Sequence, residues 1–253
     1  MGSFIIDSIG FSASHAMNEI FRAQDSFLVA HGCRNFKQNG WIGQNDQKPS
    51  DFLADMIELQ GSYRHCVAIH CLFNPQILAE EALKQGVAYY GLCRKNTAKQ
   101  VLSCFFWAVK KFLDGNVGMQ GHVIQTLERH SQTFVRLRLP ANYVSALMLY
   151  SLTRVVHFNI ALAEHSLGLI FMEDFLVNPQ SLLRLLGEPT DGVKIEVPHT
   201  VSHKQLVANY DFLNGYEETF EKLLSAVTFD FVGEPIKASE LYDVIADKNV
   251  LDL

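Results

Sequence analysis

Residues 4–23, FIIDSIGFSASHAMNEIFRA, decide the fold of this chain of 253 residues. Residues 4–9 are mostly apolar, which is typical of a strand buried in a sheet. Gly10 ends this strand, and the apolar residues between Ser12 and Ala23 recur at helical spacing. A buried strand followed directly by an amphipathic helix is the repeating unit of parallel α/β sheets.

The same order of strand and helix recurs along the rest of the chain. Apolar runs predict further strands at residues 26–30, 66–70, 87–93, 134–139 and 169–172. Spacing and capping residues predict a helical C-terminal segment and helices at residues 12–23, 51–59, 75–85, 97–113, 122–130, 142–165 and 179–187. Residues 34–49 are predicted to form a polar loop, and residues 115–121 a glycine-rich break. We therefore predict a three-layer α/β fold, in which helices flank a central and mostly parallel sheet, in one domain spanning residues 1–253.

Composition argues against several classes of protein. The chain has 21 Lys and Arg against 27 Asp and Glu, a formal net charge of −6, whereas a general nucleic-acid binder needs a basic face. Local cations and helix N-termini can still hold a nucleotide phosphate on an acidic chain. The five cysteines are irregularly spaced and form no C-x-x-C pair, so we expect reduced thiols, no metal site and a cytoplasmic protein.

No targeting or membrane-spanning segment is expected. The N-terminus lacks the basic stretch and long apolar run of a signal peptide. The longest apolar region, residues 143–163, contains Arg154, His157 and Asn159, so we predict a long buried helix there.

The turn after the first strand, GFSASH at residues 10–15, is the first candidate for a binding site. In parallel sheets ligands bind beyond the carboxyl ends of the strands, and a small polar turn that opens a helix directs backbone N–H groups at an anion. The pattern G-x-x-x-x-G-K-[ST] is absent, which disfavours an ordinary ATPase or kinase. An ordinary turn with a Ser N-cap would also explain this sequence.

Two further strand ends carry polar side chains. His70 ends the strand at residues 66–70 and could act as a general base near neutral pH or as a hydrogen-bonded structural residue. Arg94 and Lys95 end the strand at residues 87–93, and Ser103 follows two helical turns later. These groups could hold a phosphate from two sides, or the cations could simply be solvated.

Together these segments resemble the sulfotransferase family, which uses 3′-phosphoadenosine 5′-phosphosulfate (PAPS) as its donor. The resemblance lies in Ala68-Ile69-His70, then Leu92-Cys93-Arg94, then Val101-Leu102-Ser103, and in the acidic pair Glu173-Asp174. It implies a sulfotransferase-like fold, related to that of P-loop NTPases, with His70 as the catalytic base. It also implies that Arg94 and Ser103 bind the 3′-phosphate. The acidic pair is assigned no chemistry.

By the same resemblance, the first turn binds the 5′-phosphosulfate. Its residues would be the following: Gly10, Phe11, Ser12, Ala13, Ser14 and His15. The family normally has a lysine or arginine here, which this turn lacks, so His15 or a basic residue from elsewhere would have to supply the charge.

Other departures leave alternatives open. Ala68 stands where the family has a lysine, and Lys95 has the usual spacing to Ser103, so Arg94, Lys95 or both would hold the 3′-phosphate. Lys204, which precedes Asn209-Tyr210-Asp211, is a further candidate for this phosphate.

The resemblance implies in-line transfer of a sulfuryl group to an acceptor hydroxyl. The acceptor is expected to be a small molecule, a carbohydrate or a lipid, lined by residues 34–49 and 112–142, and adenosine 3′,5′-bisphosphate (PAP) would be the product. The alternatives are a non-catalytic nucleotide-binding protein of the same fold and a nucleotide-dependent kinase or glycosyltransferase.

Overall fold

The computed structural model describes residues 2–32, 48–61, 63–190, 195, 197 and 216–251. Its contacts divide the chain into two compact units. The first unit comprises Met1–Lys95, Phe158–Thr200 and Ile245–Leu253, and the second comprises Asn96–His157 and Val201–Val244. The expectation of one domain over residues 1–253 stays a prediction.

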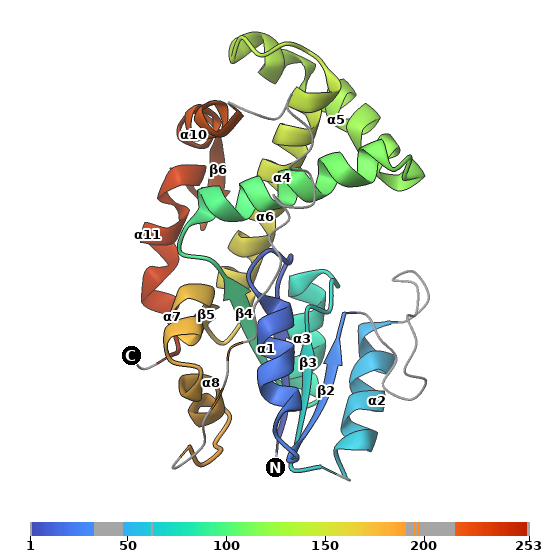
Figure 1. Cartoon of the computed structure of the whole chain (residues 1–253), viewed down its shortest axis with the longest axis vertical. Coiled ribbons are helices and arrows are strands. Elements are labelled where there is room, and N and C mark those ends of the chain that lie inside the picture. Colours follow the sequence, from blue (N-terminus) through green and yellow to red (C-terminus); the bar gives the residue numbers. More distant parts are fainter. Residues whose placement is uncertain are drawn as a thin grey trace. The chain divides into compact units, whose positions relative to one another are not determined.

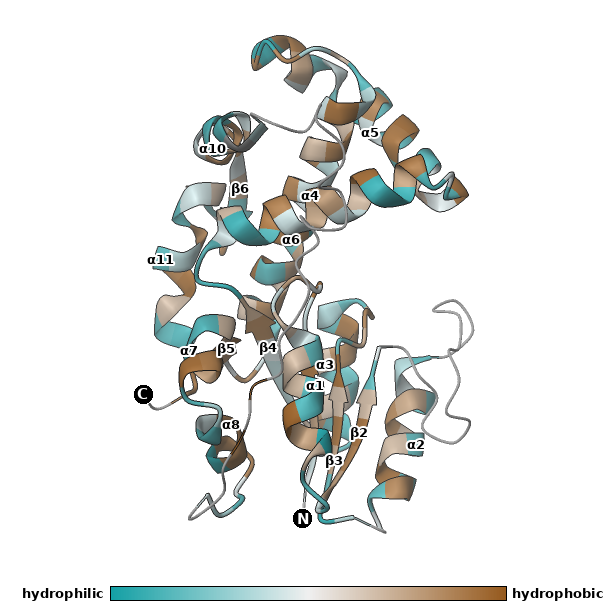
Figure 2. Cartoon of the chain, in the orientation of Figure 1, coloured by the Kyte–Doolittle hydropathy of each residue, from teal (hydrophilic) through white to brown (hydrophobic). Residues whose placement is uncertain are grey.

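The first unit is built on a five-stranded sheet with the order β2-β3-β1-β4-β5 (Figure 1). Every neighbouring pair in this sheet is parallel, which confirms the predicted parallel α/β architecture. The strands are β1 (Gly2–Asp7), β2 (Phe27–His31), β3 (His65–Ile69), β4 (Ala88–Cys93) and β5 (Leu169–Phe171). The hydropathy colouring shows the strands β2 and β3 as mostly hydrophobic, as expected for strands covered on both faces (Figure 2).

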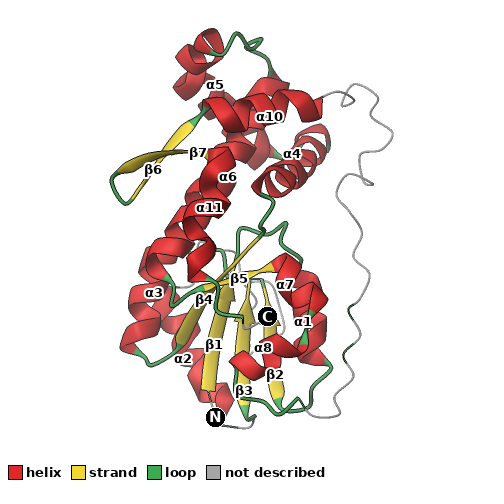
Figure 3. Ribbon diagram, turned by 90° about the vertical axis from the view of Figure 1, so that its left-hand side faces the viewer, coloured by secondary structure: helices red, strands yellow, loops and turns green. Residues whose placement is uncertain are grey.

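Helices lie on both faces of this sheet (Figure 3). Those of the first unit are α1 (Ser14–Arg22), α2 (Pro49–Gln60), α3 (Pro75–Lys84), α7 (Met172–Val177) and α8 (Gln180–Leu185). On one face, Met17, Ile20 and Phe21 of α1 join Phe175 and Leu182 in a buried cluster against the sheet. The helices α2 and α3 lie on the opposite face, which completes the three layers.

The chain path determines where a ligand site is expected. From β1 the chain runs by way of α1 to β2 on one side, and β5 is paired with β4 on the other side. The segments that follow β1 and β4 therefore diverge, and such a switch point is where parallel sheets form a crevice. The residues after Asp7 and after Cys93 lie at this edge.

The second unit is helical with one small hairpin. It contains α4 (Thr97–Leu113), α5 (Val117–Arg136), most of α6 (Tyr143–His165), α10 (Tyr216–Ala226), β6 (Thr228–Phe231), β7 (Glu234–Lys237) and a 3-10 turn (Ala238–Glu240). The chain returns to the first unit through α11 (Leu241–Ile245) and a second 3-10 turn (Ala246–Lys248). Phe105 of α4 and Phe220 of α10 pack edge to face, with ring centroids 5.0 Å apart.

The glycine-rich break at residues 115–121 is confirmed only at its start, because α4 ends at Leu113 and α5 begins at Val117, and the strand at residues 134–139 is wrong. The side chain of Asn116 accepts a hydrogen bond from the N–H of Met119 and caps α5, which runs from Val117 to Arg136 with a kink at His130. The buried side chains of Met119 and Phe134 outweigh the helix cost of the glycines.

Two other boundaries differ from expectation. The C-terminal segment is not wholly helical, because β6 and β7 pair as an antiparallel hairpin. Val232 and Gly233 in its turn both have positive φ, of 54° and 84°, which is the backbone geometry of a tight hairpin. In addition, Met172 starts α7 instead of ending a strand, so Glu173 and Asp174 lie in the first turn of a helix.

The predicted long buried helix is present as α6 (Tyr143–His165). Among the described residues it is the one helix long and apolar enough to cross a membrane, but 72% of its most apolar window is buried inside the protein. The four cysteines in the described part of the chain are also buried and unbonded: Cys66, Cys71, Cys93 and Cys104. Burial raises the pKa of Cys66 to about 12, so this thiol is unreactive at neutral pH.

Candidate functional site

Asp7, at the carboxyl end of β1, joins segments that follow the C-terminal ends of the strands. We call this end of the sheet the sheet edge. The Oδ1 atom of Asp7 accepts hydrogen bonds from the N–H groups of Ser8 at 2.9 Å, Cys71 at 2.8 Å and Leu72 at 3.3 Å. The side chain of Asp7 is fully buried. Burial raises its pKa to about 6, although the hydrogen bonds act to lower it. One carboxyl group therefore ties the turn after β1 to the segment after β3.

Asp7 was not among the candidate residues. An acidic residue at the end of an otherwise apolar strand is the signal that could have identified it, because a buried carboxylate requires hydrogen-bond donors.

The turn from Ser8 to Ala13 has an unusual backbone. Gly10, Phe11 and Ala13 all have positive φ, of 92°, 61° and 59°. Two of these residues carry side chains, for which this conformation is strained. Turns that combine left- and right-handed residues can present backbone N–H groups to an anion, and here the N–H of Gly10 is bonded within the turn, to the Ser8 hydroxyl.

The N-terminus of α1 is also suited to binding an anion. Its N-cap residue is Ala13, and no described side chain caps the first turn of the helix. The hydroxyl of Ser8 instead accepts a hydrogen bond from the N–H of Gly10 at 3.2 Å, and the Ser12 hydroxyl donates to the carbonyl of Gly10 at 3.4 Å. The Ser N-cap of the alternative explanation is therefore not found, because Ala13 is the N-cap. The serines shape the turn while the helix N-terminus keeps its attraction for an anion.

His70 is held against this turn. Its Nδ1 atom lies 2.7 Å from the carbonyl oxygen of Ser8 and 3.3 Å from the Ser8 hydroxyl. A carbonyl oxygen only accepts, so Nδ1 carries the proton, and in the neutral ring Nε2 holds the lone pair. His70 itself has a positive φ of 59°, so the chain accepts a strained backbone to hold this ring.

Two more histidines extend from His70 along the edge. The ring of His31, at the end of β2, stacks 5.7 Å from that of His70 and lies 4.2 Å from that of His15. The Nε2 atom of His31 also lies 3.2 Å from the hydroxyl of Ser14. Three imidazole rings thus border the first turn, which contains no lysine or arginine.

The sequence analysis included His15 and His70 but missed His31. The available signal was the position of His31 at the end of a predicted strand, because parallel strands bring such residues to one edge.

Arg94 reaches the first turn from the end of β4. Its Nη1 atom donates to the carbonyl of Phe11 at 3.5 Å, and its Nε atom lies 3.8 Å from Oε1 of Glu173. Only 17% of its side chain is exposed, and burial lowers its pKa against the opposing effect of Glu173. The guanidinium remains charged at neutral pH, because an arginine side chain does not lose its proton in proteins.

Lys95 contacts both residues of the acidic pair, Glu173 and Asp174. Its ammonium group contacts Oδ1 of the buried Asp174, and its backbone N–H donates to Oε2 of Glu173 at 2.9 Å. The other oxygen of Asp174 accepts a hydrogen bond from the side chain of Asn249 at 3.0 Å. Glu173 and Asp174 therefore position the two cations that follow β4.

The remaining predicted residues are Ser103 and Lys204. Ser103 belongs to the second unit, where its hydroxyl donates to the carbonyl of Lys99 at 2.9 Å. Lys204 and most of the segment 34–49 lie outside the described residues. The roles assigned to Ser103 and Lys204 stay predictions.

The edge thus combines a strained turn, a helix N-terminus without a side-chain cap, one partly buried arginine and one oriented imidazole. The first three suit an anionic group of a nucleotide, and the fourth suits removal of a proton beside it. Among the described residues, no group of three or more His, Cys, Asp or Glu side chains is arranged to hold a metal ion.

Comparisons with known proteins give one structural likeness. No family model and no curated protein matches the chain. Among solved structures, the chain is similar to the crystal structure of a sulfotransferase from Alicyclobacillus acidocaldarius, with a TM-score of 0.43 and 14% sequence identity. The alignment covers 89% of this chain and 98% of that chain. We therefore base the functional proposal on the residues at the sheet edge.

Proposed function

We propose that this chain is a sulfotransferase that moves a sulfuryl group from PAPS to an acceptor hydroxyl, with His70 as the general base. The observation that carries the proposal is the orientation of His70. Its Nδ1 atom donates to the carbonyl of Ser8, within the turn that opens α1, so its basic Nε2 belongs to the same edge as the candidate anion site.

The residues of this edge fit a phosphosulfate. The turn from Gly10 to Ala13 and the first N–H groups of α1 would hold its oxygens, and the hydroxyl of Ser14 would add a donor. Arg94 would supply the positive charge that the turn lacks, since its guanidinium already reaches Phe11. When bound, the donor supplies the sulfuryl group, which the acceptor oxygen takes up as the bond to the bridging phosphate oxygen breaks.

The proton that leaves the acceptor hydroxyl also has a destination. Nε2 of His70 accepts the proton of the acceptor hydroxyl, and the carbonyl of Ser8 stabilises the imidazolium through Nδ1–H. The bonding electrons stay on the departing PAP, next to Arg94. We propose Arg94 in preference to Lys95 as the cation that contacts the donor, because the Lys95 ammonium is paired with Asp174.

The test is a sulfuryl-transfer assay of the full chain with PAPS and a panel of hydroxylated acceptors, in which formation of PAP is measured. The proposal predicts acceptor-dependent PAP formation that His70→Ala abolishes, while PAP binding by calorimetry is unchanged. Equal turnover by wild type and His70→Ala would remove His70 as the base.

A second candidate is a non-catalytic binder of the same nucleotide. The absence of lysine and arginine from residues 10–15 favours it, because that charge normally stabilises the leaving group. PAP binding without any PAP formation from PAPS would favour this reading. A stronger thermal shift with ATP or a nucleotide sugar than with PAP would instead indicate the kinase or glycosyltransferase alternative.

A further inference from the structure

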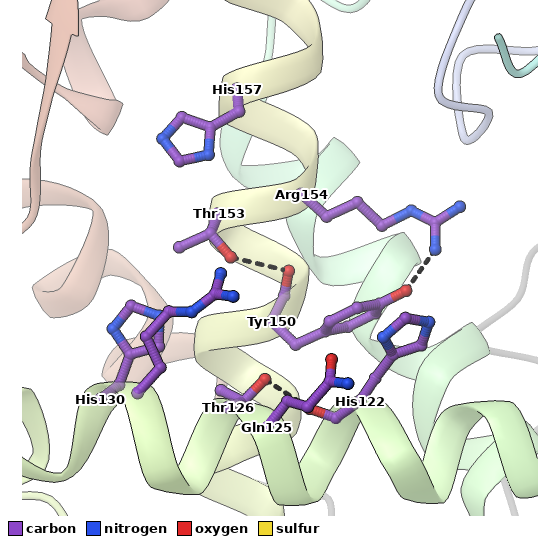
Figure 4. A pocket seen from close by; sticks show the side chains of 9 residues that line it. His122, Gln125, Thr126, His130, Tyr150, Thr153, Arg154 and His157 are labelled. Atoms are coloured by element: carbon purple, nitrogen blue, oxygen red, sulfur yellow. Dashed lines mark hydrogen bonds between the residues drawn. The ribbon is translucent and has the colours of Figure 1, made fainter. Parts of the chain in front are cut away.

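A polar cavity lies within the second unit, between α5 and α6. It has a volume of about 430 Å³, which is within the range of small-molecule sites. Figure 4 shows the two helices crossing, with Tyr150, Arg154 and His122 on one side of α6 and Thr153, His157 and His130 on the other. The lining residues are His122, Gln125, Thr126, Arg129 and His130 of α5, and Tyr150, Thr153, Arg154 and His157 of α6.

This lining is polar and partly open to solvent, because His122, Gln125, Arg129 and His157 are exposed. The positions recur at the three- and four-residue spacing of a single helix face on each helix. Here every lining residue of both faces has a polar group. The apolar side chains that α5 buries are Met119, Val123 and Phe134, and none of them lines the cavity, whereas Thr126 is both buried and part of the lining.

The charge of the lining is also one-sided. It contains Arg129 and Arg154 and no aspartate or glutamate among the described residues that form it. The chain as a whole has 27 acidic and 21 basic residues, so it is acidic overall. The described lining of this cavity, with two arginines and no carboxylate, has the opposite charge. Such a cavity attracts an anion.

Arg154 is already oriented. Its Nη1 atom donates to the hydroxyl of Tyr150, and its guanidinium lies 5.5 Å from the centre of the Trp107 ring and 5.6 Å from that of Tyr150. The Tyr150 ring in turn stacks on His122, with centroids 5.2 Å apart and planes inclined by 27°. A guanidinium held by two aromatic rings loses little freedom when it binds a planar or tetrahedral anion.

The neutral polar side chains of the lining indicate which groups the ligand carries besides its acidic group. Gln125 and the hydroxyl of Thr153 can pair with sugar hydroxyls, although Thr153 also donates to the carbonyl of Leu149 at 2.8 Å. The His122 and Tyr150 rings offer flat faces for the C–H side of a sugar. A single inorganic ion would use only part of a cavity of about 430 Å³.

We propose that the cavity between α5 and α6 binds a sugar-sized organic anion, which carries a phosphate, sulfate or carboxylate together with hydroxyl groups. The acidic group contacts Arg129 and Arg154, and the hydroxyls contact the neutral polar side chains. All nine lining residues belong to the second unit, and none of them is assigned to the proposed donor site.

The test is calorimetric titration of the full chain with glucose 6-phosphate, glucuronate, glucose and inorganic phosphate. The proposal predicts saturable binding of glucose 6-phosphate or glucuronate, no detectable binding of glucose, and binding of inorganic phosphate that is about tenfold weaker or more. Equal binding of glucose, equal binding of inorganic phosphate, or no binding of either acidic sugar would overturn it.

Matched arginine variants locate the site. Arg129→Met should weaken binding of the acidic sugar about tenfold or more, because one charged contact is lost. Arg136→Met, which removes an exposed arginine from the end of the same helix, should leave binding unchanged. Equal losses in the two variants would assign the effect to general charge and would refute this site.

Arg154→Lys tests the oriented guanidinium without removing the charge. It should weaken binding while circular dichroism and the unfolding temperature show that the variant is folded, and wild-type affinity in the folded variant would count against the proposal. His70→Ala should leave binding in this cavity unchanged, so failure of the proposed transfer reaction and failure of this site can be told apart.

Discussion

The carbonyl oxygen of Ser8 and the Nδ1 atom of His70 lie 2.7 Å apart, although 62 positions separate the two residues in sequence. This contact fixes the tautomer of the imidazole, because Nδ1 must donate to the carbonyl. It also joins the turn after β1 to the end of β3. The orientation of His70 therefore depends on the shape of the turn that we propose as the anion site.

The first prediction tests this dependence through Gly10. A Cβ atom at Gly10 would lie 3.3 Å from Cε1 of His70, and Gly10 has a φ of 92°. Gly10→Ala should therefore displace the His70 ring and lower kcat of sulfuryl transfer. Gly86→Ala is the matched control, because Gly86 has a φ of 68° and nothing lies within 4 Å of its added Cβ. Both variants should lose about 1–2 kcal/mol of stability in urea, from the left-handed conformation alone. A normal kcat for Gly10→Ala would show that the turn does not position His70.

The second prediction separates the two cations after β4. Arg94→Met should weaken PAP binding ~10- to 100-fold in calorimetry, because a charged contact to the nucleotide is lost. Lys95→Met should mainly lower the free energy of unfolding, by about 1–3 kcal/mol, since the buried Asp174 loses its cation. The reverse pattern, in which only Lys95→Met loses PAP affinity, would assign the phosphate contact to Lys95.

The third prediction concerns the pH dependence of stability through Asp7. Its pKa rises from 3.8 to about 6 on folding because the carboxyl group is buried. A raised carboxyl pKa means that the folded state holds the proton more tightly, so the stability it contributes is full below pH 3.8 and is lost as pH rises through about 6. Asp7→Asn should remove this component from the urea unfolding curve measured across that range. An identical pH dependence in wild type and Asp7→Asn would show that the Asp7 pKa is not raised.

The parallel sheet could be predicted from sequence because its signal is local. Each strand of the sheet is a short apolar run next to a helix with one apolar stripe, and burial on both faces leaves little else that such a run could form. The long helix α6 was predicted on the same grounds, with Arg154 and His157 as the evidence against a membrane span.

The glycine-rich segment of α5 could not be predicted in this way. Gly118 and Gly121 lower local helix preference, and their cost is offset by the packing of Met119 and Phe134 in the second unit. The cap at Asn116 was the one local sign that a helix begins there.

The site was only partly visible in the sequence for a related reason. His70 and Arg94 lie at strand ends, which the pattern identifies. The hydrogen bonds of Asp7 to Cys71 and the stacking of His31 on His70 join distant segments, so only strand order and register reveal them. Positive φ at Phe11 and Ala13 is equally invisible, because these residue types rarely adopt it.

The last prediction links protons to anion binding in the cavity between α5 and α6. Burial lowers the pKa of His122, His130 and His157 below 6.5, with Arg154 adding to the effect at His122 and Arg129 and His157 at His130. An anion would favour the protonated rings, so binding of glucose 6-phosphate should take up protons and strengthen as pH falls toward and below 6.5.

Calorimetry in two buffers of different ionisation enthalpy measures this uptake directly. Tyr150 also faces the cavity, but burial raises its pKa, so its hydroxyl stays protonated throughout and does not contribute. His157→Asn should reduce the proton uptake, because it removes one of the three rings, whereas Arg136→Met should not alter it. Binding enthalpies that are equal in the two buffers would mean that the histidines do not take part in holding the anion.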